Sequence, residues 1–366
     1  MALKAGIVGL PNVGKSTLFN AITKQKILAA NYPFATIDPN VGVVTVPDTR
    51  LDYLVNLYQP KSVVPSSYEF IDIAGLVKGA SNGEGLGNKF LSHIREVDAI
   101  VEVVRCFDDK DITHVEGGVD PIRDIEIINV ELILADLEVA NNRITKLGKK
   151  VSMTKDKNEL LEINTLKKAI ENLEKNIPLR LVEWDKEEIA VLKNFSFITY
   201  KPIIYVANVN EDTIGTSGNE YTECVREYAG KENAGVIMMC AKIEEELAVL
   251  ADDERKVFME DLGISSSGLD QLIFATYDLL GLATFFTSGT DECRAWTFKK
   301  GYKAPECAGI IHTDFQRGFI KAEVMSFDDL KEYGSELKVK EAGKVRLEGK
   351  EYVMQDGDIV YFRFNV

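Results

Sequence analysis

The stretch GLPNVGKST, residues 9–17, decides the fold of this chain. It satisfies the pattern G-x-x-x-x-G-K-[ST] and lies between an apolar run at 5–8 and a helical run at 18–22. Glycines let the backbone N–H groups of such a loop surround phosphate oxygens, and the N-terminus of the following helix adds its positive dipole end. Strand, loop and helix in this order predict a doubly wound α/β domain built around a phosphate-binding loop.

The residue types in the loop have distinct expected tasks. Lys15 is expected to reach the β- and γ-phosphate oxygens, and Ser16 to ligate Mg²⁺. The other residues expected to contact the nucleotide here are Asn12, Val13, Gly14 and Thr17. A glycine turn between any strand and helix is the alternative, which a Lys-Ser pair at this offset disfavours. The chain is therefore predicted to bind a nucleoside triphosphate.

Asn12 adds an expectation about a second cation. It matches the asparagine with which potassium-activated phosphate-loop enzymes help to hold K⁺ beside the phosphates. Such a cation takes over part of the charge neutralisation that an arginine otherwise supplies. The same asparagine occurs in enzymes that K⁺ does not activate, so both interpretations stay open.

Two further segments have the pattern of nucleotide-sensing switches. Thr36 lies in a proline-flanked loop at 31–40 and is expected to close on Mg²⁺ and the γ-phosphate. Asp72 ends an apolar run at 67–71 and begins a D-x-x-G motif, so its carboxylate is expected to serve Mg²⁺ and the Gly75 N–H to meet the γ-phosphate. The glycine-rich run 79–87 does not match G-x-G-x-x-G, and we interpret it as a switch loop.

The residue after D-x-x-G bears on hydrolysis. Many GTPases place a glutamine there to orient the attacking water, whereas this chain has Leu76, whose alkyl side chain cannot hold water. The catalytic group must then come from elsewhere. His114, in the polar loop 108–114, is our candidate; its alternative is a solvated surface histidine.

The choice of purine is indicated by Asn208, Val209 and Glu211, which follow an apolar strand at 202–206. Guanine-binding proteins usually have N-K-x-D here, because the aspartate accepts two hydrogen bonds from guanine. The extra methylene of Glu211 displaces the carboxylate, which should remove that bidentate contact and a discrimination of about 10⁴–10⁵ with it. ATP is therefore expected to bind better than GTP. The turn at 240–242 resembles the S-A-K turn that closes over the base.

Composition limits the classes of protein. The 366 residues have a net charge of −15, and most of the acidic excess lies between residues 201 and 280, so no basic footprint for DNA is present. No secretory signal or 18-residue apolar span is found, and a membrane partner is not expected. The five cysteines are scattered without a C-x-x-C pair, which favours a reducing cytoplasm.

Residues 121–200 interrupt the strand–helix alternation with helical sequence. Apolar residues at 3-4-3-4 spacing are typical of a coiled-coil seam, and two such seams predict an antiparallel helical hairpin. One seam is Ile163, Leu166, Ile170, Leu173 and Ile177, and the other is Val130, Leu134, Leu137, Asn141 and Ile144. Lysines near the expected tip, between 146 and 157, either contact RNA or are simply hydrated.

From about residue 283 onward short apolar runs alternate with turns, which predicts a compact α+β domain. The runs expected as strands include 310–311, 319–320, 345–347 and 359–362. Arg294, Trp296 and Lys299 interleave cations with an aromatic ring, as an RNA-contacting surface does, although strand packing explains Trp296 equally well.

Together these residues resemble the Obg-like ATPase (YchF) family, a branch of the Obg-related translation GTPases. The phosphate loop, Thr36, the D-x-x-G motif with Leu76, and the N-x-x-E run all match, and the resemblance spans the chain. It implies preference for ATP, a catalytic role for His114, a helical hairpin insert, a ubiquitin-like β-grasp (TGS) C-terminal domain and a partner in the ribosome or its RNA.

The predicted organisation is a nucleotide domain at 1–280, interrupted by the hairpin at 121–200, and a TGS domain at 281–366. The predicted function is a cytoplasmic, Mg²⁺-dependent ATP-hydrolysing switch that acts at the ribosome in translation or stress regulation. A GTPase with relaxed purine specificity is one alternative. A slow nucleotide-gated module that binds the ribosome or a protein is another, because Leu76 leaves open that hydrolysis needs a partner.

Overall fold

The computed structural model describes residues 3–24, 40–73, 86–109, 117–151 and 156–365. The chain forms two compact units. The N-terminal unit contains residues 1–43 and 69–272, and the C-terminal unit contains residues 44–68 and 273–366. The sequence-based division counted residues 44–68 with the nucleotide domain, whereas in the structure they pack with the C-terminal residues.

The N-terminal unit is built on a six-stranded sheet with the order β2-β4-β1-β5-β6-β7. β1 pairs in parallel with β4 on one side and with β5 on the other, and β6 and β7 continue in parallel beyond β5. The direction of winding reverses at β1, which makes its C-terminal end a topological switch point. The strands are β1 (Lys4–Val8), β2 (Val41–Thr45), β4 (Ser67–Asp72), β5 (Ala99–Arg105), β6 (Ile203–Asn208) and β7 (Gly235–Met239).

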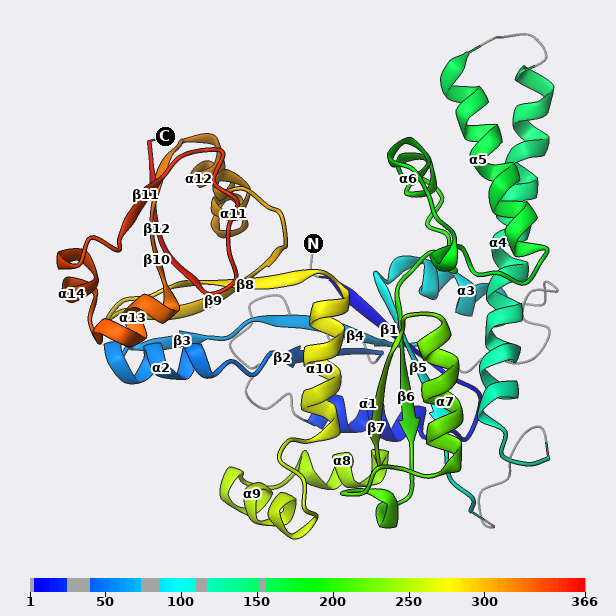
Figure 1. The fold of residues 1–366 in the computed structure, drawn as a ribbon, viewed down its shortest axis with the longest axis horizontal. Coiled ribbons are helices and arrows are strands. Elements are labelled where there is room, and N and C mark those ends of the chain that lie inside the picture. The colour runs from blue at the N-terminus through cyan, green and yellow to red at the C-terminus, as the bar shows by residue number, and fades with distance from the viewer. Residues whose placement is uncertain (1–2, 25–39, 74–85, 110–116, 152–155, 366) are drawn as a thin grey trace. The chain divides into compact units, whose positions relative to one another are not determined.

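Helices flank this sheet (Figure 1), with α1 packed against α8 and α4 packed against α7. Every residue of β5 and β6 is buried, as parallel strands between two helical layers must be. This confirms the predicted doubly wound α/β fold. The helices are α1 (Lys15–Lys24), α3 (Leu86–Glu96), α4 (Pro121–Val151), α5 (Lys157–Leu173), α6 (Lys186–Leu192), α7 (Glu220–Lys231), α8 (Ala241–Leu247), α9 (Asp252–Asp261) and α10 (Gly268–Leu279), the last of which crosses into the C-terminal unit.

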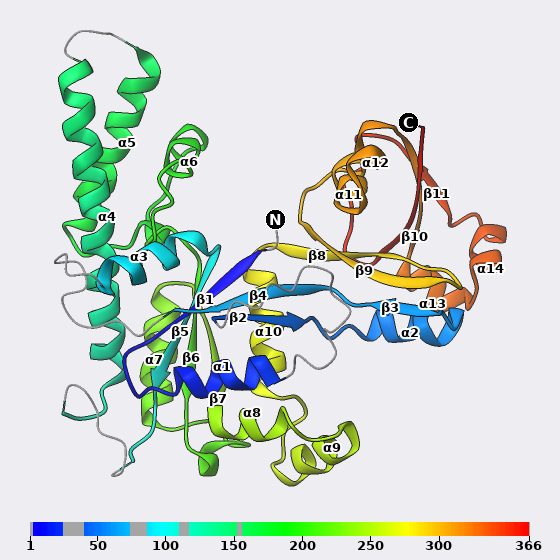
Figure 2. The same cartoon turned by 180° about the vertical axis from the view of Figure 1, so that it is seen from behind.

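The predicted helical hairpin is present as α4 and α5, which lie side by side and extend away from the sheet (Figure 2). Asp156 caps α5 by accepting a hydrogen bond from the Asn158 N–H. The buried residues of the hairpin core are Ile133, Ala140, Leu147, Leu166, Ala169, Leu173, Leu179, Leu192 and Phe197.

The seam predicted on α4 is wrong at three of its five positions. Val130 and Leu134 are 42% and 43% exposed, and Asn141 is exposed as well. Leu137 and Ile144 do pack in the hairpin core, as predicted, and their neighbours there are Ile133, Ala140 and Leu147. The first half of α4 also packs on β5 and α7 and so carries apolar residues on more than one face, which makes periodicity ambiguous.

The C-terminal unit contains a mixed six-stranded sheet with the order β11-β10-β12-β8-β9-β3. β8 and β9 form an antiparallel pair, while β3, from the segment 44–68, adds to β9 in parallel. The strands are β3 (Ser62–Val64), β8 (Leu282–Thr287), β9 (Glu292–Lys299), β10 (Phe319–Ser326), β11 (Arg346–Glu348) and β12 (Asp358–Phe364).

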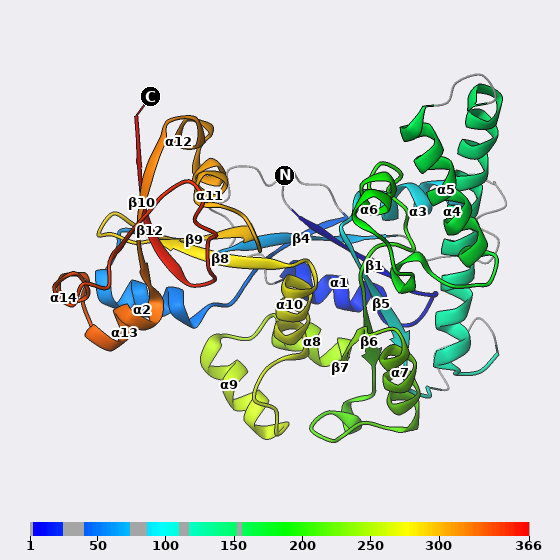
Figure 3. The same cartoon turned by 45° about the horizontal axis from the view of Figure 1, so that its top comes forward.

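Helices cover both faces of this second sheet (Figure 3), and each face has its own apolar cluster. Residues of α11 join a cluster with Phe285 and Phe298, whereas residues of α2 join one with Phe286 and Ile359. This arrangement confirms the predicted α+β class of the unit. Its helices are α2 (Thr49–Tyr58), α11 (Ala304–Ile311), α12 (Thr313–Arg317), α13 (Phe327–Tyr333) and α14 (Glu336–Glu341).

One predicted strand is wrong. Ile310 and Ile311 end helix α11 rather than forming a strand. The helix starts with a capping interaction between the Lys303 N–H and the Glu306 carboxylate, and Pro305 stands in its first turn. The small buried residues Ala304 and Ala308 let it approach the sheet closely, a tertiary reason that the short apolar run at 310–311 did not reveal.

Within the described residues, no helix is both long and apolar enough to cross a membrane. The five cysteines are free thiols, and Cys224 is the exposed one among them.

Candidate functional site

The phosphate loop lies at the C-terminal end of β1, the switch point of the N-terminal sheet. Asn12 and Gly14 both have positive φ, of 64° and 97°. These two left-handed residues turn the chain from the strand into α1, whose helical hydrogen bonding starts with Leu18 N–H donating to Gly14 O at 3.0 Å. Val13 is buried, whereas Asn12 and Ser16 are exposed. The loop therefore has the conformation that the motif predicts.

Gly14 is needed for space as well as for backbone conformation. A Cβ atom at this position would lie 2.2 Å from Nδ2 of Asn208, which no real packing tolerates. The same approach brings the Asn208 amide close enough to donate to Val13 O at 2.8 Å. The second glycine of the motif thus allows a side chain from another strand to hold the loop from behind.

Asn208 joins three segments that are far apart in the chain. Its Nδ2 donates to Val13 O in the phosphate loop, and its Oδ1 accepts from the Ala241 N–H at 3.0 Å. The residue is 4% exposed, so both hydrogen bonds are shielded from water. Asn208 is predicted to contact the nucleotide, and its amide is bonded to the phosphate loop and to the turn at 240–242.

Lys15 of the phosphate loop and Asp72 form an ion pair. Lys15 begins α1 and Asp72 ends β4, which neighbours β1 in the sheet. Their side chains are 10% and 20% exposed, so little water screens the two charges. The sequence predicted a phosphate ligand and a Mg²⁺-serving carboxylate, and the structure brings the two together.

Val209 and Glu211 follow β6 directly. Val209 is buried, and its N–H donates to Met239 O at 2.9 Å, which ties the turn after β6 to the end of β7. Glu211 is exposed, and its Oε1 lies 2.5 Å from Nζ of Lys242. The hydrogen bond to Glu211 raises the pKa of Lys242. Sequence reasoning noticed the turn at 240–242 but missed this ion pair.

Three expected site residues, Thr36, Gly75 and His114, lie outside the described residues, as does Leu76. The described part of the chain contains a residue that the sequence did not single out, Arg105 at the end of β5. Its side chain is 1% exposed, and it donates to Phe107 O at 3.1 Å and to Asp109 O at 3.3 Å. Arg105 thereby holds the start of the segment that leads toward His114. An arginine at the end of a strand that is apolar apart from Glu102 was the available signal.

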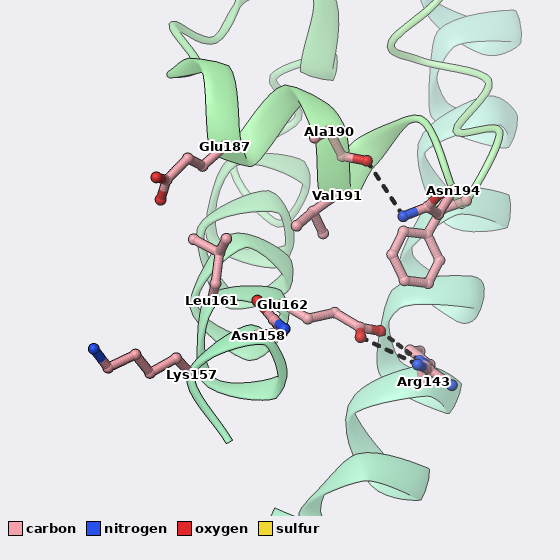
Figure 4. Close-up of a pocket in the computed structure, with 10 residues that line it drawn as sticks. Arg143, Lys157, Asn158, Leu161, Glu162, Glu187, Ala190, Val191 and Asn194 are labelled. Atoms are coloured by element: carbon pink, nitrogen blue, oxygen red, sulfur yellow. Dashed lines mark hydrogen bonds and ion pairs between the residues drawn. The ribbon is translucent and has the colours of Figure 1, made fainter. Parts of the chain in front are cut away.

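A separate groove lies in the hairpin region, between α4, α5 and α6 (Figure 4). It has a volume of about 950 Å³, and its apolar lining includes Leu161, Val191 and Phe195. An ion pair between Arg143 and Glu162, with Nε and Oε1 2.6 Å apart, stands at its wall. None of the phosphate-loop residues lines this groove.

Known proteins with similar sequences show which family has this site. A family model described as a 50S ribosome-binding GTPase matches residues 4–142, and the model YchF-GTPase_C, described as a protein of unknown function, matches residues 282–365. Ribosome-binding ATPase YchF from Bacillus subtilis (strain 168) is 62% identical over the full length of both chains, and the one from Pasteurella multocida is 54% identical, also over both full lengths. Obg-like ATPase 1 from Caenorhabditis elegans is 46% identical over 99% of this chain and 92% of its own.

A solved structure shares the fold as well as the sequence. The YchF GTPase from Schizosaccharomyces pombe superposes with a TM-score of 0.90 and is 43% identical, covering 99% of this chain and 98% of its own. The match thus covers nearly the whole of both chains. The chain therefore belongs to the YchF family of Obg-like ATPases.

Proposed function

We propose that this protein is a Mg²⁺-dependent ATP-hydrolysing switch that acts at the ribosome in the cytoplasm. The observation that supports it most is the linkage through Asn208, which ties the phosphate loop to the turn after β7. This residue would carry a shift of the loop on binding or hydrolysis to the turn at 240–242, which we assign to the base. The family models and relatives named above add support, since their names refer to ATPases, GTPases and ribosome binding.

The site chemistry fits a magnesium nucleotide. Ser16 is exposed in the first turn of α1, and Asp72 supplies a carboxylate at the end of the neighbouring strand. Such oxygen ligands suit Mg²⁺, which keeps several waters and shares phosphate oxygens with its nucleotide. When bound, the ion supplies neutralisation of phosphate charge. We assign Thr36 as a further ligand, Gly75 as a γ-phosphate contact and Asn12 as a contact for K⁺.

Lys15 is the residue whose partner changes in this mechanism. It pairs with Asp72 inside the site, and a triphosphate offers it a more highly charged partner. Val13, Gly14 and Thr17 complete the phosphate loop. Because Leu76 cannot hold water, we assign the positioning of the attacking water to His114.

We infer a preference for ATP over GTP from Val209 and Glu211. The lysine of the N-K-x-D pattern is replaced by a buried valine, and the aspartate by a longer side chain that Lys242 already engages. Titration with labelled nucleotides should give tighter binding of ATP than of GTP. Equal or reversed affinities contradict this assignment and favour a GTPase that uses the same phosphate chemistry.

We place the ribosome contacts on the hairpin and on the TGS-like C-terminal unit rather than on the acidic segment 201–280. Phosphate contacts of this kind weaken steeply as salt rises, because counterion release drives them. Co-sedimentation with ribosomes should fade with added salt. Substitution of hairpin lysines is the better test than deletion of 281–366, because that deletion would uncover the apolar face of α2.

Hydrolysis measured with and without ribosomes separates an ATP-hydrolysing switch from a nucleotide-gated binding module. An ATPase rate that ribosomes raise, and that His114→Ala lowers without weakening ATP binding, supports the switch. A rate that stays at background in every condition, with ATP-dependent ribosome binding, supports a nucleotide-gated binding module instead, the alternative that Leu76 favours.

A further inference from the structure

The turns that follow β6 and β7 lie side by side for a reason visible in the sheet. The two strands pair in parallel with Asn208 opposite Met239, the last residue of each. The Val209 N–H continues this pairing by donating to Met239 O at 2.9 Å. The next residues of both segments, 209–213 and 240–242, therefore leave the sheet as neighbours.

A side-chain hydrogen bond then sets the relative position of the two turns. Asn208 Oδ1 accepts from the Ala241 N–H at 3.0 Å, and Asn208 is itself held by Val13 O. Lys242 follows Ala241 directly, and its Nζ lies 2.5 Å from Glu211 Oε1. The ion pair is thus built on a buried scaffold, although its own side chains are 67% and 52% exposed.

The ion pair between Lys242 and Glu211 affects the binding of guanine and the binding of adenine differently. Guanine presents two neighbouring N–H donors, and a carboxylate reads them by accepting both hydrogen bonds with its two oxygens. An ammonium group on one oxygen of Glu211 competes for that acceptor and neutralises its charge. Adenine presents an acceptor rather than a donor at the corresponding ring nitrogen, so it loses nothing when the carboxylate is engaged.

We propose that Lys242 is a purine-selecting residue, which disfavours GTP by holding the Glu211 carboxylate in an ion pair. This inference rests on the proposed preference for ATP and gives it a cause beyond the length of the Glu211 side chain. It also implies that Glu211→Asp by itself does not restore a full guanine contact, because Lys242 remains available to the shorter carboxylate.

Equilibrium titration of the full chain with labelled ATP and GTP tests the proposal. Lys242→Met removes the charge and keeps the length of the side chain. It should tighten GTP binding by up to about fivefold, the upper end of what an exposed ion pair contributes, and leave ATP binding unchanged. Lys242→Arg keeps the pair and should keep the wild-type ratio of affinities.

Two controls isolate the ion pair. Lys175→Met breaks an exposed pair of similar length, 2.7 Å to Glu171, in the hairpin, and should change neither affinity. In a Glu211→Gln background, Lys242→Met should have no effect on the ratio of ATP to GTP affinity. The carboxylate that Lys242→Met would release is absent there. Thermal unfolding of each variant verifies that it is folded.

The outcomes distinguish this inference from the function it rests on. An unchanged ratio in folded Lys242→Met overturns it, as does a shift that persists in the Glu211→Gln background or an equal loss of both nucleotides. A wild-type protein that prefers GTP contradicts the proposed ATP preference, whereas the shift caused by Lys242→Met still reports on the ion pair.

Discussion

Gly14 has a φ of 97° and stands against the amide of Asn208, so two separate requirements meet at one residue. The phosphate-loop motif contains the glycine because phosphates need exposed N–H groups. The structure adds that the same glycine admits the side chain that holds the loop to the turn at 240–242. At the residue scale, the most informative contacts join positions that the sequence separates widely.

Gly14→Ala should lower the affinity for both ATP and GTP by about ten- to hundredfold, because backbone strain and displacement of Asn208 together cost about 1–3 kcal/mol. Gly263→Ala is the matched control. Its φ is also positive, 69°, but a Cβ there meets nothing within 4 Å, so it should reduce stability slightly and leave nucleotide affinity intact. Equal effects of the two substitutions on nucleotide titrations would show that strain, not the Asn208 contact, matters.

Asn12 gives a prediction about the cation. If it helps to hold K⁺ beside the phosphates, turnover should be faster in K⁺ than in Na⁺ at fixed ionic strength, and Asn12→Ala should remove the difference while Mg²⁺ dependence stays. Steady-state hydrolysis in the two salts measures this. Rates that do not change between K⁺ and Na⁺ remove the K⁺ site from the proposal.

At the element scale, strand β5 shows how the insert is built into the N-terminal unit. Glu102 on this strand is 1% exposed, and neither of its carboxylate oxygens has a hydrogen-bond partner among the described residues. Desolvation raises the pKa of Glu102 well above its usual value. Arg180, just beyond the hairpin, opposes this rise, while Glu232 and Asp124 add to it. The strand, α4, α7 and the end of the insert meet around this carboxyl group.

The raised pKa of Glu102 gives a pH prediction with a definite sign. The folded state holds its proton to higher pH than the unfolded state, so the free energy of unfolding falls as pH rises from the ordinary glutamate pKa toward the folded one. Glu102→Gln keeps the shape and removes the titration. The stability of this variant relative to wild type should therefore increase with pH over that window.

Denaturant unfolding at several pH values between 4 and 8 measures the difference in the free energy of unfolding between Glu102→Gln and the wild type. Glu187→Gln, on the exposed side of α6, is the matched substitution at an exposed position. A constant difference between Glu102→Gln and wild type at every pH would contradict a raised pKa.

At the scale of the whole molecule, the chain order does not follow the compact units. Residues 44–68 leave the N-terminal unit to supply α2 and β3 to the C-terminal one. Leu51 and Leu54 of α2 are buried against Phe286 and Ile359, and Arg50 makes an ion pair with Asp356 at 2.7 Å. The C-terminal unit is therefore incomplete without a segment more than 200 residues earlier.

Leu54→Ala in the full chain should destabilise the C-terminal unit by about 2–5 kcal/mol, because Leu54 is fully buried. Leu57→Ala on the same helix is the control; Leu57 is 36% exposed, and its loss should cost about 1 kcal/mol or less. A Trp184→Phe background leaves Trp296 as the only tryptophan, so fluorescence reports unfolding of this unit. Equal midpoints for the two alanine variants would contradict the packing of α2.

The sequence by itself determined the chemistry of the phosphate loop, the doubly wound fold and the existence of the hairpin. Each of these depends on local signals: the spacing of glycine, lysine and serine, continuous apolar strands, and helical periodicity. The runs predicted at 5–8 and 67–71 nearly match β1 and β4, because a buried parallel strand has the pattern of a short apolar run between polar turns.

Only the tertiary structure decided which face of α4 enters the hairpin core, that residues 310–311 end a helix, and that residues 44–68 complete the C-terminal unit. It also revealed the bridge through Asn208, the pairing of Lys15 with Asp72 and that of Lys242 with Glu211. These contacts join residues from 31 to 195 positions apart. Such pairings follow from the order of strands in a sheet, which local periodicity does not encode.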